Sequence, residues 1–368
     1  MRRAFRSAIP VLALAALSVG LLFLPGPRQL ASAAGETSRA EVISVDNSDL
    51  ALHGLIEFGT QHLVVRLPDG REVEANNELR AQLEYDKKFE VGDCALVVLG
   101  EEPMVARDHW RTGYLAALFG GFCLLLVAFG GWTGLKALFS FLLSCLAIWK
   151  LLIPLCLNGW NAQAVSFFTV AVLTFVIMYL VAGWTRKAFV ACAGAMLGVS
   201  VSLVLANLSS VLLHVNGATM PFVQTLFYSG YYQLKIADIF MGATILGSSG
   251  AVMDLAMDIA AGMDEVRLHN PALPRRALLA SGFRMGRAVV GTMTTTLLLA
   301  YSGGFLTLLM MFAAEGTSPL DILNSTLVSA EVVKTLVGSF GLVLVAPFTA
   351  LVGSFVFQRG QRSGESRG

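Results

Sequence analysis

The sequence predicts a mainly α protein: a polytopic bundle of seven transmembrane helices plus an N-terminal signal or anchor helix, with a small exported all-β domain. Two observations support this. Hydrophobic residues make up 55% of the 368-residue chain and charged residues only 14%. Apolar runs recur after residue 110, each near the roughly 20 helical residues that cross a hydrocarbon core of about 30 Å. The net charge of +1 gives no sign of nucleic acid as a partner.

Residues 1–34 have the composition of a secretory signal. Arg2, Arg3 and Arg6 precede an apolar stretch at 9–24, and the small residues at 31–34 resemble a cleavage site. The same pattern is typical of an uncleaved anchor helix. Both alternatives export the segment that follows.

Residues 36–109 are polar and predict a small barrel of the OB or SH3 kind. The strand-like runs are AEVISV, HLVVRL, REVEA and VGDCALVVLG, and the turn residues PDG separate the second from the third. The segment lacks the aromatic stacking face and basic groove that nucleic-acid binding requires. We expect a compact cap on the membrane domain rather than an independent ligand-binding module.

The membrane domain is expected over residues 110–358, with a cytoplasmic tail at 359–368. Lysine and arginine gather in the loops on one side of the predicted spans, and the positive-inside rule makes that side cytoplasmic. The sequence therefore predicts a plasma-membrane protein with residues 36–109 exported and the C-terminus inside. The predicted spans cover residues 113–130, 135–155, 164–183, 188–208, 236–261, 290–312 and 336–357.

Two carboxylates lie in the fifth predicted span, within the stretch GATILGSSGAVMDLAMDIAAGMDEV. On a helix of about 3.6 residues per turn, Asp254 and Asp258 share one stripe with small residues that include Gly247 and Gly250. Small residues let another helix come close, and a charge is costly in lipid. We therefore expect the stripe to face protein.

The sixth span offers partners for these carboxylates. A single inner loop joins the two helices, so we expect them to be neighbours. Arg284 or Arg287 is then placed to pair with Asp258, Asp264 or Glu265, and Thr292 or Thr295 to donate a hydrogen bond to Asp254. The stripe on the sixth span that carries these groups consists of Arg284, Gly291, Thr295 and Ser302, with Thr292 beside it.

Three functions fit the carboxylate pair. An interhelical clamp would lock two helices together, and a transport pathway would bind or relay a proton or cation. An intramembrane aspartyl protease is disfavoured, because a one-turn spacing on one helix separates the groups by about 6 Å along the axis. The five cysteines are scattered, and hydrolase and nucleotide-binding motifs are absent. We therefore expect no metal, no cofactor and no enzymatic activity.

Three stretches resemble the YibE/F-like family of bacterial multi-pass membrane proteins: GSSGAVMDLAMDIAAGMDEV, FRMGRAVVGTMTTTL and LVGSFGLVLVAP. The resemblance extends from about Trp110 to Phe357. It implies a bacterial inner-membrane protein with an exported N-terminal region, and it supplies no reaction or catalytic residues.

The best functional hypothesis from the sequence is transport of a small solute or ion by the intramembrane carboxylates. The alternative is a non-transporting scaffold or partner subunit whose exported β domain docks another protein. The expected partners are the lipid bilayer and either a second copy of the chain or another membrane protein.

Overall fold

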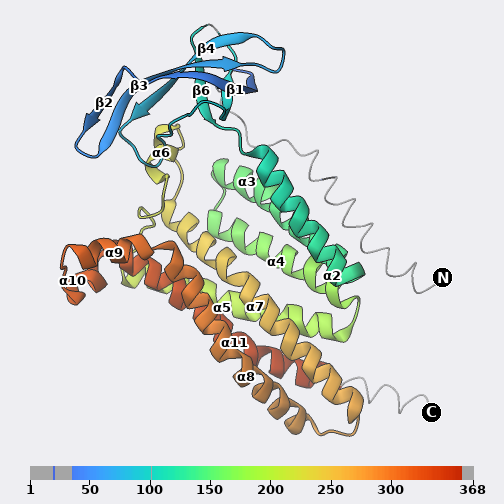
Figure 1. Ribbon diagram of the computed structural model, residues 1–368. Helices are drawn as coiled ribbons and strands as arrows, with labels where there is room; N and C mark the ends of the chain where they lie inside the picture. The colour runs from blue at the N-terminus through green and yellow to red at the C-terminus, as the bar shows by residue number, and fades with distance from the viewer. Residues whose placement is uncertain (1–19, 21–34, 101, 359–368) are drawn as a thin grey trace. The chain divides into compact units, whose positions relative to one another are not determined.

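Two compact units make up the computed structural model, which describes Gly20 and residues 35–100 and 102–358 (Figure 1). One unit contains the strands and continues through Phe129, and the other contains the helices from Gly130 onward. The predicted signal or anchor helix, apart from Gly20, and the predicted tail at 359–368 lie outside the described residues.

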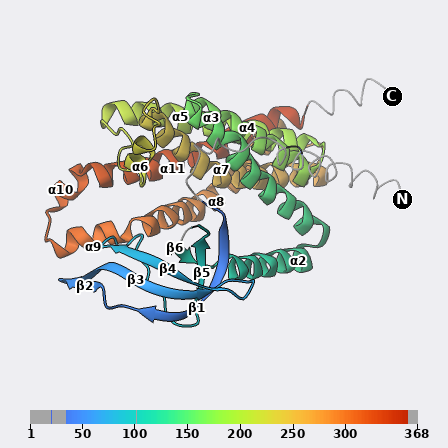
Figure 2. The ribbon, with the colours of Figure 1, turned by 90° about the horizontal axis from the view of Figure 1, so that it is seen from above.

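The strand-containing unit is a small β barrel. Its strands pair in the order β1, β5, β6, β4, β3, β2, and a further pairing of β1 with β3 closes a ring of five, with β2 at the edge (Figure 2). The barrel expected from the sequence is confirmed. The strands are β1 (Thr37–Asp46), β2 (Leu50–His53), β3 (Ile56–Arg66), β4 (Glu72–Arg80), β5 (Cys94–Val98) and β6 (Met104–His109).

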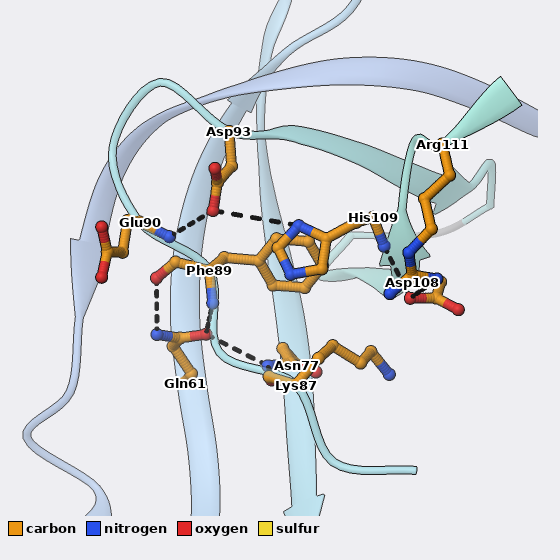
Figure 3. Close-up of polar contacts among 9 residues, drawn as sticks. All are labelled: Gln61, Asn77, Lys87, Phe89, Glu90, Asp93, Asp108, His109 and Arg111. Atoms are coloured by element: carbon orange, nitrogen blue, oxygen red, sulfur yellow. Dashed lines mark hydrogen bonds and ion pairs between the residues drawn. The ribbon is translucent and has the colours of Figure 1, made fainter. Parts of the chain in front are cut away.

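Two buried amides fix the long connection between β4 and β5 to the barrel (Figure 3). The Gln61 side chain donates to the carbonyl oxygen of Phe89 and accepts from the Phe89 N–H, both at 3.0 Å. The Asn77 Nδ2 donates to Gln61 Oε1 at 3.1 Å and to the Lys87 carbonyl at 2.6 Å. Both side chains are fully buried, and these bonds offset part of the cost of removing them from water, although Asn77 Oδ1 has no hydrogen-bond partner among the described residues.

The hydrogen bonds of the His62 imidazole should make the stability of the barrel depend on pH. Its Nε2 lies 2.8 Å from Asp49 Oδ2 and its Nδ1 lies 2.9 Å from Asn76 Oδ1. The hydrogen bond to Asp49 raises the pKa of His62 above 6.5, because both acceptors favour the doubly protonated ring. The contact therefore stabilises the barrel fully below pH 6.5, and the gain is lost as the pH rises through the raised pKa.

An NMR titration of the histidine side chains tests this contact. The resonance of His62, assigned by its disappearance in His62→Gln, should give a pKa above 6.5. A value at or below 6.5 would show that the two acceptors do not hold the proton.

Long helices follow the barrel in the chain, beginning with α2 in the strand-containing unit and continuing through the second unit, and they overlap all seven predicted spans. Among the described residues, five helices are long and apolar enough to cross a membrane, or six if the α8–α9 pair, bent by 63°, counts as one span. The predicted number of seven is not confirmed. The helical elements from α2 onward are α2 (Thr112–Ala147), η1 (Ile148–Leu152), α3 (Ile153–Leu157), α4 (Ala162–Ala182), α5 (Arg186–Leu212), α6 (Val223–Tyr228), α7 (Ile236–His269), α8 (Arg275–Gly304), α9 (Leu306–Ala314), α10 (Pro319–Asn324) and α11 (Thr326–Val356).

The difference in number arises where the first two spans were predicted. The helices α2, η1 and α3 form one run of 46 residues, Thr112–Leu157. Gly131 interrupts this run with φ 53° and ψ −127°, outside the helical region. The residues expected to form a loop at 131–134 therefore form a break within a helix.

Glycines bring α5, α7 and α11 into close contact. A Cβ atom at Gly198 on α5 would lie 3.0 Å from Val345 Cβ and 3.1 Å from the Gly341 carbonyl oxygen on α11. It would also lie 3.1 Å from a methyl group of Val252 on α7. Gly194 likewise approaches Thr349, so the backbones of α5 and α11 pack with almost no side chain between them.

Substitution at this crossing should destabilise the helical unit. Gly198→Val adds atoms where the nearest neighbours leave no room, so we expect a loss of about 1–3 kcal/mol in the free energy of unfolding. Thermal unfolding in detergent measures this loss. The matched control is Gly250→Ala on α7, where nothing lies within 4 Å and stability should be unchanged or slightly raised. Equal stability of the two variants would contradict the close crossing.

Candidate functional site

Helix α7 is buried on one side by its neighbours. It contacts α4, α5, α8 and α11, and Figure 1 shows it running through the bundle beside them. Ile245, Val252, Leu255 and Ile259 lie on the buried side and belong to the main apolar core. These contacts fix the rotation of α7 about its own axis.

The opposite side of α7 is exposed, and it is the stripe that carries the two carboxylates. Asp254 and Asp258 are exposed, and so are the small residues Ala243, Gly247 and Gly250. The spacing of three or four residues places them on one face. The stripe predicted from the sequence therefore exists, but the part that carries Asp254 and Asp258 is exposed rather than packed against another helix of the same unit.

Two contacts set the register between α7 and the antiparallel helix α8. The Tyr301 hydroxyl oxygen lies 2.9 Å from the position of a Cβ on Gly247, and the Met285 sulfur lies 2.7 Å from that on Gly262. The two helices are therefore neighbours, as the short loop between them predicted. This register places Asp254 level with Thr294 on α8.

The hydrogen bonds and ion pairs expected between α7 and α8 are not formed within the described part of the chain. Neither Asp254 nor Asp258 has a hydrogen bond or an ion pair there. Arg284 Nη2 donates instead to Ser281 Oγ on its own helix, at 3.1 Å. The hydroxyls of Thr292 and Thr295 donate to their own helix, to the carbonyls of Val289 and Gly291 at 2.9 and 3.0 Å.

The register and the rotation of α8 explain this outcome. Arg284 lies level with Met263, five residues or about 7.5 Å along α7 from Asp258. Arg284 and Arg287 are both exposed, whereas Gly286 between them packs against Ala346 of α11. The arginines therefore occupy the outer face of α8, away from α11.

The glycines proposed for close packing on this face differ in their surroundings. Gly247 lies against the ring of Tyr301, whereas Gly250 and Gly291 have no neighbour within 4 Å. The Tyr301 hydroxyl is buried and has no hydrogen-bond partner in the region that the structure describes. A buried hydroxyl without a hydrogen-bond partner among the described residues therefore lies at the edge of the carboxylate stripe, and no sequence pattern indicates it.

Two further residues missed from the sequence are Arg267 on α7 and Arg275 on α8, which hold the end of α11. Arg267 Nη1 donates to the carbonyl oxygen of Phe357 at 3.1 Å. The Arg275 guanidinium lies 3.1 Å from the centre of the Phe355 ring. These cation–π and carbonyl contacts join distant parts of the chain, so no local sequence pattern indicates them.

The candidate site is an exposed face rather than a pocket. A cavity of ≈ 100 Å³ lies near the other end of α7 and is lined by residues that include Asn161, Lys235 and Asp238. It does not include either aspartate of the stripe. Across the described residues, no group of three histidine, cysteine or acidic side chains is arranged to hold a metal ion.

Several helices long and apolar enough to cross a membrane, preceded in the chain by a small β barrel, are the architecture of a multi-pass membrane protein. The model of the YibE/F-like protein family matches residues 118–359. The match covers most of the chain, so the chain belongs to the YibE/F-like family, as its motifs predicted. No curated protein and no solved structure matches it significantly.

Measurements of thermal stability distinguish an unpaired Asp258 carboxylate from one that clamps two helices together. Because Asp258 has no ion pair in the described chain, Asp258→Asn should leave the thermal unfolding temperature in detergent unchanged within error. Arg267→Gln serves as the positive control, since it removes the bond to the Phe357 carbonyl and should cost about 1–3 kcal/mol. A loss in Asp258→Asn as large as that in Arg267→Gln would establish the clamp.

Proposed function

We propose that this YibE/F-like protein is a transporter, and not an enzyme, in which Asp254 and Asp258 line a polar path for a proton or small cation. The observation that carries the proposal is the exposed, unpaired carboxylate stripe on an apolar membrane-length helix. The proposed substrate is a small solute that moves together with that ion.

The position of Asp254 along α7 supports the proposal. At about 1.5 Å per residue it lies about 27 Å from Ile236 and about 22 Å from His269, near the middle of α7. A lipid-facing aspartate at the centre of a membrane helix costs about 3 kcal/mol on insertion scales. The stripe is thus better explained by water or a bound cation than by contact with lipid.

Neighbouring hydroxyls support a cation path. Thr292, Thr295 and Thr296 are exposed on α8, and their hydroxyls donate to carbonyls of their own helix. Their oxygen lone pairs remain available to accept a proton or to contact a cation. Together with the Tyr301 hydroxyl and the two carboxylates, they supply the oxygen ligands that hard cations prefer.

The proposed orientation uses seven spans. A straight helix of 46 residues would be about 69 Å long, more than twice a hydrocarbon core of about 30 Å. A break at Gly131 divides the run into two spans, and the bent α8–α9 pair supplies another. The arginines around the α7–α8 loop then face the cytoplasm of a bacterium, the β barrel is exported, and the C-terminus is inside.

A partner subunit or scaffold is the second candidate, and the open glycines favour it. Gly250 and Gly291 have no neighbour within 4 Å, so a helix from a second copy or another membrane protein has room to pack there. In that case the carboxylates would pair with the partner rather than with a transported ion.

Flux through reconstituted vesicles tests the proposal. Wild-type protein should carry a proton or alkali-cation flux, and Asp254→Asn should lower it at least tenfold without changing the unfolding temperature. Tyr301→Phe should also lower the flux, since its hydroxyl makes no hydrogen bond that the fold needs. Asp321→Asn on α10 is the matched control, because that carboxylate is exposed beside Ser318 and lies outside the stripe.

If Asp254→Asn shows wild-type flux in every assay, the transport proposal is wrong. Absence of flux in all proteins, together with loss of an oligomer or complex in Gly250→Leu, would establish the partner-subunit alternative.

A further inference from the structure

Large apolar side chains are exposed on the loops at one end of the β barrel. Leu55, at the tip of the β2–β3 hairpin, is 98% exposed, and Leu83, in the β4–β5 connection, is 80% exposed. Leu52 on β2 and Phe58 on β3, which flank the hairpin tip, are also exposed, as is Val91 in the β4–β5 connection. We call these five side chains the apolar loop cluster. An exposed group of this size on a small domain indicates a contact surface.

Strand register places the hairpin tip at the barrel end from which α2 leaves. Phe58 pairs with Arg80, so the start of β3 lies beside the end of β4. β4 runs parallel to β6, with Ala75 opposite Met104, so the end of β6 lies at the same end of the barrel. Only two residues separate His109 at the end of β6 from Thr112 at the start of α2.

The β4–β5 connection reaches the same end. The Phe89 ring packs against His109, with ring centres 4.5 Å apart, and Figure 3 shows the two side chains together beside Asp108 and Arg111. The buried Gln61 holds the backbone of Phe89. Leu83 and Val91 flank this anchored point, so both parts of the apolar loop cluster lie near the start of α2.

The tip of the β2–β3 hairpin and the start of α2 extend a similar distance beyond the end of the barrel. Leu55 is three residues beyond Phe58, and Thr112 is three residues beyond His109, or at most about 10 Å of extended chain in each case. Residues of the first turns of α2, including Tyr114 and Leu118, are exposed and apolar, as a lipid-facing helix requires.

The opposite end of the barrel is polar. Its β3–β4 turn contains Asp69 and Arg71, which form an exposed ion pair at 2.6 Å. The β5–β6 connection contains the exposed residues Glu102 and Pro103. Most of the large exposed apolar side chains of the barrel thus lie at the end next to α2, whereas Val105, at the start of β6, is exposed at the far end. Charged side chains occur at both ends, since Lys88 and Glu57 form an exposed ion pair near the start of β3.

We infer that the apolar loop cluster inserts into the bilayer surface at the leaflet where α2 begins, so that its ligand is lipid. The inference rests on α2 crossing the membrane and does not depend on transport. The short link to α2 already holds the cluster at the surface, so weak apolar contacts suffice to dock it. Docking would fix the tilt of the barrel against the membrane.

Photocrosslinking in full-length protein tests the inference. A photoreactive phenylalanine analogue replaces Leu55 in one variant and Asp69 in the matched control, and both are reconstituted in phosphatidylcholine vesicles. Illumination should give a phospholipid adduct at position 55, detected by mass spectrometry, at least tenfold more abundant than at position 69. Because the contact is apolar, the yield should persist at about 1 M salt.

A second variant checks that the cluster acts as a unit. With the photoreactive analogue at position 83, Leu52→Ser combined with Leu55→Ser should lower the lipid adduct several-fold, while the exposed positions leave barrel folding intact. Equal adduct yields at positions 55 and 69 would overturn the inference. So would crosslinks at position 55 mainly to the same chain, a second copy or another protein. None of these outcomes depends on whether the vesicles carry flux.

Discussion

The glycine-mediated crossing of α5, α7 and α11 is the constraint on which the rest of the helical unit depends. Lipid tails are as apolar as the side chains, so helices in a bilayer gain little from burying apolar surface and rely on close packing. Gly198 on α5 meets Val345 and Gly341 on α11 and Val252 on α7. This three-way contact buries one side of α7 and therefore decides which side remains open.

The open side carries Asp254 and Asp258, and this has an electrostatic consequence. Arg284 and Arg287, which could neutralise the two aspartates, occupy the outer face of α8. Arg267 and Arg275 contact the end of α11 instead. The carboxylates must therefore be solvated by water, a cation or another protein. The barrel is a separate unit with its own core, so its contact with lipid follows from its own loops and not from this face.

Sequence periodicity predicted the position of the helices, the barrel, the proximity of α7 and α8, and the shared stripe of Asp254 and Gly250. It did not predict which way the stripe points. Small residues suggested that Gly250 lay in a packed interface, whereas nothing lies within 4 Å of its Cβ position and the close crossing of α5 and α11 is made by Gly194, Gly198 and Gly341. Helix rotation depends on such contacts between distant segments, and one sequence does not contain them. The contacts of Arg267 and Tyr301 were missed for the same reason.

Solvent access to position 254 tests whether the face that carries Asp254 and Asp258 is hydrated. In a protein whose five cysteines are replaced by serine or alanine, Asp254→Cys is treated in vesicles with a small cationic methanethiosulfonate and compared with Val252→Cys on the buried face. If the face is hydrated, the cysteine at position 254 should be modified at least a hundredfold faster than the cysteine at position 252. Equal, slow modification at both positions would show that the carboxylate face is dry and that the two aspartates line no polar path.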